Sequence, residues 1–81
     1  MAGYVTKSKR SAAEVLDKAL EFFGPEGEGL EIVEMTEGLA HFRGGGGHVL
    51  IETSPTDDGT QVDFEVREWD RQVINFMEAI T

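Results

Sequence analysis

The feature that most constrains the fold is an alternation from Val62 to Arg67 that runs directly into an amphipathic segment. Val62, Phe64 and Val66 are separated by charged residues, a period of two that is typical of a strand with one buried and one solvated face. After Trp69 the apolar residues change to helical spacing. This second stripe consists of Val73, Phe76, Met77 and Ile80. Because a sheet with one apolar face must be covered, the sequence predicts an α+β fold in which this helix covers the strand before it.

A second helix is predicted over residues 11–23. Ser11 and Glu14 have the spacing of a capping box, and apolar residues follow at intervals of three and four. Gly24 is expected to end the helix in the left-handed conformation that glycine accepts at a C-cap. Before this helix, residues 4–6 predict either a short edge strand or an irregular terminus.

Between the two helices the sequence predicts four strands. They are residues 30–35, 39–43, 48–53 and 60–67. The first of them has apolar residues on both parities, which predicts a bulge or burial of both faces. A polar turn is expected at residues 54–59. Short connections favour an antiparallel meander. The predicted architecture is a single two-layer α+β domain over residues 1–81. Two helices pack on one face of a four- or five-stranded sheet, in the order α-β-β-β-β-α with an optional short N-terminal strand.

Residues 44–47 are four consecutive glycines between two predicted strands. A hairpin that pairs Arg43 with His48 accounts for them. A phosphate-binding loop would lead from a strand into the N-terminus of a helix, and this run leads from strand to strand. The alternative is that the glycines form a mobile lip beside a ligand or a partner.

In that register Leu39 and Leu50 are expected to lie opposite each other on the solvated face of the sheet. An apolar pair surrounded by both charge signs is typical of the centre of a two-fold interface, although exposed apolar pairs also occur on monomers. The residues expected around the pair are His41, Arg43, His48 and Glu52.

The sequence contains two kinds of candidate metal site. His41, His48 and Glu52 would form a set of two histidines and one carboxylate that suits zinc, while the neighbouring arginine argues for plain surface histidines. Acidic loops, such as the one that holds Asp57 and Asp58, could bind calcium weakly. Trp69, at the junction of strand and helix, is either a structural latch or an aromatic anchor for a partner.

Composition narrows the function classes. The chain has 16 acidic and 7 basic residues and a net charge of −9, a field that repels phosphate backbones and anionic lipids, so neither nucleic acid nor membrane is expected as a partner. It has no cysteine, which removes disulfides and thiolate chemistry and favours a cytoplasmic location. Its Ser, His and Asp residues do not form a recognisable triad, so no enzymatic activity and no cofactor are expected.

The order of helix, meander and Trp-led C-terminal helix resembles a shortened helix-grip domain of the START/polyketide-cyclase-like superfamily. The resemblance is carried by Ser8 to Phe23 and by Thr60 to Ile80, about half of the chain. It also resembles small α+β proteins of archaea. Helix-grip domains curve a longer sheet around a ligand cavity, and this chain has too few strands for a sizeable one. This shortage of strands argues against the binding of lipids or other hydrophobic ligands that the resemblance would imply. A separate alternative is a small apolar ligand between the C-terminal helix and the sheet. The residues there, which also suit a plain core, are Phe42, Phe64, Trp69, Phe76 and Met77.

The sequence therefore favours a non-enzymatic binding module that contacts a second copy of itself, or another protein, through the solvated sheet face. The alternatives are a binder of a small apolar ligand and a weak binder of Ca²⁺ or Zn²⁺.

Overall fold

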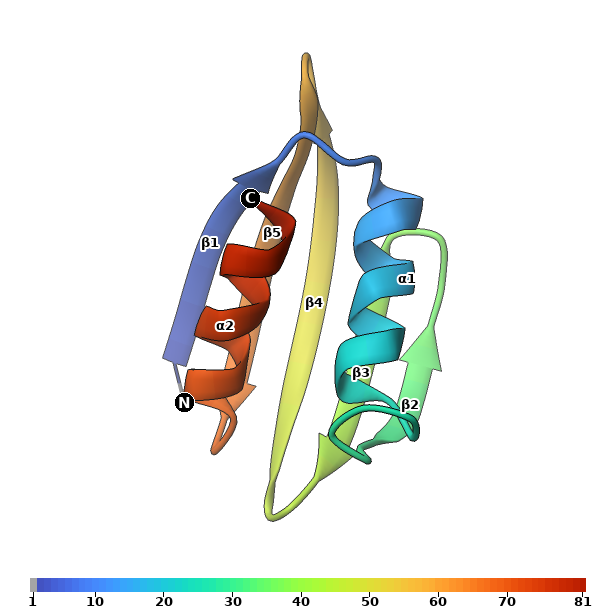
Figure 1. The fold of residues 1–81 in the computed structure, drawn as a ribbon, viewed down its shortest axis with the longest axis vertical. Coiled ribbons are helices and arrows are strands. Elements are labelled where there is room, and N and C mark those ends of the chain that lie inside the picture. The colour runs from blue at the N-terminus through green and yellow to red at the C-terminus, as the bar shows by residue number, and fades with distance from the viewer. Residues whose placement is uncertain (1) are drawn as a thin grey trace.

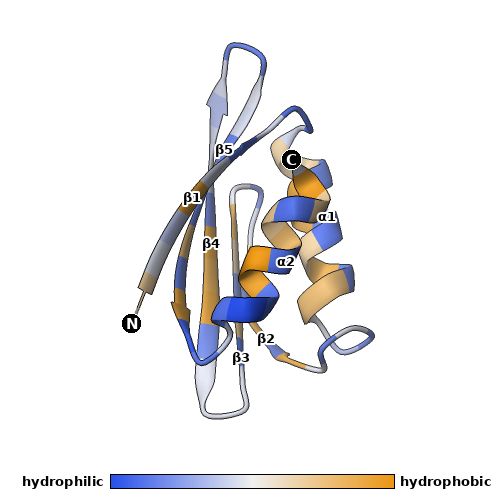
Figure 2. Cartoon of the chain, turned by 60° about the vertical axis from the view of Figure 1, so that its left-hand side comes forward, coloured by the Kyte–Doolittle hydropathy of each residue, from blue (hydrophilic) through white to orange (hydrophobic). Residues whose placement is uncertain are grey.

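A computed structural model describes residues 2–81, and Met1 of the predicted 1–81 domain lies outside the described residues. The elements in chain order are β1 (Ala2–Ser8), α1 (Ala12–Phe23), β2 (Glu31–Met35), β3 (Leu39–Gly44), β4 (Gly47–Thr56), β5 (Gly59–Arg67) and α2 (Asp70–Ile80). The strands form one antiparallel sheet in the order β1-β5-β4-β3-β2. Both helices lie on the same side of this sheet (Figure 1 and Figure 2). The predicted α+β architecture is confirmed.

Helix α1 begins at the predicted capping box. The backbone N–H of Glu14 donates to Ser11 Oγ at 3.2 Å, and the N–H of Ser11 donates to Glu14 Oε1 at 3.4 Å. The expected left-handed cap at Gly24 is wrong, because this residue is extended, with φ of −70°. Glycine is needed there for another reason. A Cβ atom at this position would lie 2.5 Å from the carbonyl oxygen of Leu20, which already accepts the Gly24 N–H.

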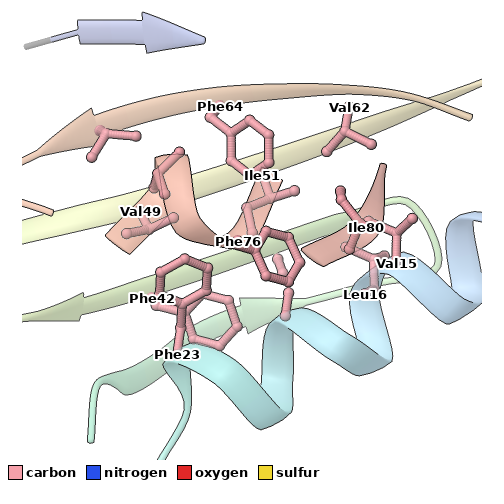
Figure 3. Packing of buried hydrophobic residues seen from close by; sticks show 14 of the residues in the cluster. Val15, Leu16, Phe23, Phe42, Val49, Ile51, Val62, Phe64, Phe76 and Ile80 are labelled. Atoms are coloured by element: carbon pink, nitrogen blue, oxygen red, sulfur yellow. The ribbon is translucent and has the colours of Figure 1, made fainter. Parts of the chain in front are cut away.

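The core lies between the two helices and the sheet (Figure 3). Its centre is a group of phenylalanine rings from four different elements. The ring of Phe76 in α2 lies 5.3 Å from Phe23 in α1 and 6.0 Å from Phe64 in β5, measured between centroids. Phe23 in turn lies 5.7 Å from Phe42 in β3. Aromatic contacts therefore join both layers of the fold.

The strands that extend furthest beyond their predicted ranges are β1 and β4. β1 is not limited to residues 4–6, because it pairs with β5 from Ala2 to Ser8. The polar turn expected at 54–59 is also wrong: β4 continues to Thr56 and only Asp57 and Asp58 lie between the strands. Beyond Glu52, β4 has left the β3 ladder and pairs with β5 alone. Pro55 is tolerated in this part of β4 because proline is compatible with the edge of a sheet.

The predicted irregularity in β2 is a bulge. Ile32 pairs with Phe42 and Glu34 pairs with His41, so that Val33 is an extra residue in the ladder. All five residues of β2 are exposed. The strand lies at one edge of the sheet, and both of its faces are therefore only partly covered by other residues.

The four glycines form the predicted hairpin, with a turn of only two residues. Gly44 pairs with Gly47, while Gly45 and Gly46 have φ of 57° and 80°, as in the type I′ turn that matches the twist of a hairpin. Gly47 is required by close packing, because a Cβ atom there would lie 2.0 Å from the carbonyl oxygen of Arg67. The glycine run is thus a structural feature of the sheet.

Candidate functional site

The candidate site is the sheet face opposite the helices, called here the open face. The strand register places the predicted residues of β3 and β4 on it, together with three residues of β5. Its central members are Leu39, His41, Arg43, His48, Leu50, Glu52, Asp63, Glu65 and Arg67. The sequence interpretation omitted the β5 residues from the site. The alternation of 62–67 predicts that these three side chains are solvated. It does not indicate which residues of β4 lie beside them.

One detail of the predicted face is wrong. Leu39 pairs with Glu52, and Leu50 pairs with His41. The two leucines are diagonal neighbours because the hairpin ladder starts from Gly44 and Gly47 and advances one residue on each strand. Both side chains are half-buried, so the open face has a small apolar centre formed by two offset leucines.

The charges of the open face are separated along the strands. In the ladder rows next to the glycine turn, Arg43 pairs with His48, which pairs with Arg67. Four residues further along β4, Glu52 pairs with Asp63. Across β3, β4 and β5 the face therefore has a basic end, an apolar centre at Leu50 and an acidic end, and Glu31 of β2 lies beside Arg43 at the basic end.

The basic end contains a shallow hollow with a volume of about 570 Å³. Its walls include His41, Arg67 and the hairpin glycines. An ion pair joins Arg43 Nη2 to Glu31 Oε2 at 3.1 Å, and both side chains are about two-thirds exposed, at 64% and 66%. His48 Nε2 lies 3.7 Å from Glu65 Oε2. An exposed pair such as that of Arg43 and Glu31 is screened by solvent and individually weak.

The two histidines are neighbours, as their diagonal register predicted. The ring centroids of His41 and His48 are 5.9 Å apart, with an interplanar angle of 86°. Glu52 does not complete a set with them, since it lies two ladder rows beyond Leu50 and pairs with Leu39. Over residues 2–81, no group of three His, Asp or Glu side chains is placed to hold a metal ion.

The acidic pair Asp57 and Asp58 lies far from the histidines. These residues form the β4–β5 turn, at the opposite end of the molecule's long axis from the β3–β4 glycine turn (Figure 1). The structure therefore does not bring the two kinds of predicted metal ligand together.

Trp69 lies apart from the open face. Its Nε1–H donates to the carbonyl oxygen of Gly44 at 2.9 Å, and its ring packs against the core. A Cβ atom on Gly45 would lie 3.0 Å from Cζ2 of the indole. The tryptophan thus joins the start of α2 to the glycine hairpin through a hydrogen bond and ring packing, as the structural interpretation of this residue predicts.

The region expected for an apolar ligand is occupied by the core. Phe42, Phe64 and Phe76 are at most 4% exposed, and the rings of Phe64 and Phe76 contact each other (Figure 3). Trp69 and Met77 are partly buried and pack against the same cluster. The five residues stabilise the contact between α2 and the sheet.

These features define a two-layer α+β domain with one open, charge-separated sheet face. Comparison of the chain with protein families, with curated proteins and with solved structures finds no match. The resemblance to helix-grip domains therefore stays a prediction. Within residues 2–81, neither helix is both long enough and apolar enough to cross a membrane.

Proposed function

We propose that this chain is a non-enzymatic interaction module that forms a homodimer through its open face. The observation that supports the proposal is the order of groups along the strands: Arg43 and Arg67 at one end, Leu50 at the centre, and acidic side chains at the other end. A surface with this order is complementary to a second copy of itself rotated by a two-fold axis.

The expected arrangement places the axis across the strands, near Leu50. Rotation about it stacks Leu50 of one copy on Leu50 of the other and brings Arg67 of each copy over the acidic end of the other, near Asp63. Opposite charges then meet at both ends of the contact, which favours one orientation over others. The apolar centre supplies the dehydrated core that protein interfaces usually contain.

The contact area predicts a weak dimer. Five strands at a spacing of about 4.8 Å, with about five residues of 3.4 Å each, cover about 400 Å² of flat surface. Standard interfaces bury about 800 Å² on each partner. We therefore expect a dissociation constant of about 10 μM or more, and association must be measured at concentrations up to about 1 mM.

Sedimentation equilibrium tests the proposal with two matched variants. Leu50→Arg places a charge at the centre of the open face and is expected to weaken association at least tenfold, or about 1.4 kcal/mol. Ile74→Arg introduces the same charge at an exposed apolar residue of α2, where Ile74 is 42% exposed, and is expected to leave association unchanged. Equal weakening by both variants would contradict a contact through the open face, because one added positive charge lowers the magnitude of the net charge of −9 and reduces the repulsion between copies.

A charge exchange tests the two-fold geometry. Arg67→Glu and Asp63→Arg should each weaken the dimer, because each places like charges opposite one another. The double variant restores the opposite pairing between copies and should recover most of the affinity. A wild-type chain that stays monomeric throughout the concentration range, or a double variant weaker than either single one, would contradict the proposed homodimer.

A further inference from the structure

A second surface of the molecule is the outer edge of β2. Its apolar side chains are exposed, with Ile32 at 40%, Val33 at 44% and Met35 at 36%. β2 pairs with β3 on one side, and in the described part of the chain no strand pairs with its other side. An exposed apolar edge strand is a template for pairing with another chain, and proteins usually protect such edges.

The register sorts the side chains of β2 by chemistry. Ile32 and Met35 pair with Phe42 and Ala40, which point into the core, so these two apolar residues lie on the helix side of the edge. Glu31 and Glu34 pair with Arg43 and His41 of the open face, so both carboxylates lie on the opposite side.

A groove lies on the helix side of this edge, at the end of β2. It has a volume of about 540 Å³ and lies between α1 and the end of β2. Its walls are Ala13, Leu16 and Asp17 from the helix, and Met35, Thr36 and Glu37 from the strand and the turn after it. An extended chain that paired with β2 would direct every second side chain toward the helix side, and the one beside Met35 would face this groove.

The charged residues of β2 and of the loops on either side of it are all acidic. Residues 24–38 contain five glutamates and no lysine, arginine or histidine. Of these glutamates, Glu31 alone forms an ion pair within residues 2–81, to Arg43. A second copy of β2 would bring like charges together across the new ladder. A basic chain would meet opposite charges.

We propose that β2 binds an extended segment of a partner protein in which apolar and basic residues alternate. The segment adds a sixth strand to the sheet through backbone hydrogen bonds. Its apolar side chains lie on the helix side of the sheet, with one in the groove beside Met35, and its basic side chains lie near Glu31 and Glu34. This surface is separate from the centre of the open face, so the proposal does not depend on homodimer formation.

Titration with a synthetic peptide tests this proposal by ¹H–¹⁵N NMR. The probe is Lys-Val-Lys-Val-Lys-Val-Lys, capped at both ends, and the control is the matched peptide with Glu in place of Lys. The basic peptide should cause saturable shifts in the amides of β2 and of Ala13 to Asp17, with no comparable shift at Leu50. The acidic peptide should cause no saturable shift.

Two pairs of variants separate groove filling from charge. Ala13→Trp fills the groove from an exposed position on α1 and should weaken peptide binding at least tenfold, whereas Ala79→Trp, at an exposed position on α2, should not. The double change Glu31→Lys and Glu34→Lys should weaken binding about tenfold, since the two proposed charge contacts become repulsive. The same reversal at Glu26 and Glu28, in the loop before β2, should have a much smaller effect.

Several results would overturn the proposal. They are the absence of saturable shifts with the basic peptide, equal binding of the acidic peptide, shifts confined to the open face, and self-association of the chain through β2. Shifts confined to the open face and self-association through β2 can each be told apart from a failure of the homodimer proposal. Leu50→Arg alters only the open face, and Ala13→Trp alters only the groove.

Discussion

Tyr4 links the first strand to the last helix through a single hydrogen bond. Its phenolic O–H donates to Asp70 Oδ2 at 2.5 Å, which joins β1 to the first turn of α2. This hydrogen bond raises the pKa of Tyr4 above 10.0, and burial and the charge of the Asp70 carboxylate act in the same direction. The protonated phenol is therefore the form that the fold favours.

The raised pKa predicts a measurable alkaline titration. Because the folded pKa lies above the unfolded one, the contribution of Tyr4 to stability is complete below pH 10 and is lost as the pH rises through the folded value. Tyr4 is the only tyrosine, so tyrosinate absorbance reports it directly. Asp70→Asn should lower the midpoint toward 10, and Asp63→Asn should leave it in place. Unchanged midpoints in both variants would show that the hydrogen bond does not control this titration.

Ser8 performs a similar linking role inside the molecule. It is 5% exposed, its Oγ–H donates to the carbonyl oxygen of Ile80, and its oxygen accepts the backbone N–H of Arg10 at 3.1 Å. The carbonyl of Ile80 lies in the last turn of α2, where helical partners run out. Ser8 of β1 thus donates a hydrogen bond to a carbonyl group at the C-terminal end of α2.

Replacement of this hydroxyl is expected to destabilise the fold. Ser8→Ala should lower the free energy of unfolding by about 1–3 kcal/mol, because a buried carbonyl and a backbone N–H lose their partner. Urea unfolding measures the change. Ser54→Ala, at an exposed position of β4, is the matched control and should change stability by less than about 0.5 kcal/mol. Equal effects would mean that water replaces the Ser8 contact.

The four glycines of the β3–β4 hairpin are expected to differ in how well they tolerate substitution. Gly47→Ala should destabilise the fold by about 3 kcal/mol, since its Cβ would lie 2.0 Å from the Arg67 carbonyl oxygen and the β4–β5 contact must shift. Gly46→Asn should be tolerated, because nothing lies within 4 Å of that Cβ position and asparagine accepts a positive φ. Thermal unfolding of the two variants compares them. A larger loss for Gly46→Asn would contradict this account of the hairpin.

The elements that were predictable are those with local signals. The capping box of Ser11 and Glu14 marked the start of α1, and the alternation of 62–67 marked β5. The ends of β1 and β4 were not predictable to the same degree. Ala2 becomes a strand residue because β5 pairs with it, and the strand at Pro55 continues because Thr60 pairs with it. Neither partner is visible in the local pattern.

The stability of the whole molecule depends on a small core. A domain of this size is expected to have a free energy of unfolding of about 4–12 kcal/mol. Phe76 is 1% exposed and contacts rings from α1 and β5. Phe76→Ala should cost about 3–5 kcal/mol, a large share of that free energy of unfolding. Ile74→Ala, on the solvated side of α2, should have a small effect. Urea unfolding of both variants measures this, and similar losses would contradict the assigned core.

The sequence predicted which residues of β3 and β4 lie on the open face, but not which of them are neighbours across the strands. The period of two placed His41, Arg43, His48, Leu50 and Glu52 on one face, because side-chain direction follows from the backbone alone. The offset of the two leucines required the ladder to be counted from the two-residue glycine turn. The charge separation required β5 to be added beside β4.

Local chemistry along the chain determined the two helices, the apolar and solvated faces of the strands, and the glycine hairpin. These properties depend on residues close in sequence, through capping, periodicity and the conformational freedom of glycine. The tertiary structure decided that β1 lies beside β5, that the apolar edge of β2 remains exposed, and which charges are neighbours on the open face. Those outcomes depend on pairing between residues far apart in the chain, and such pairing is selected by the packing of the entire core.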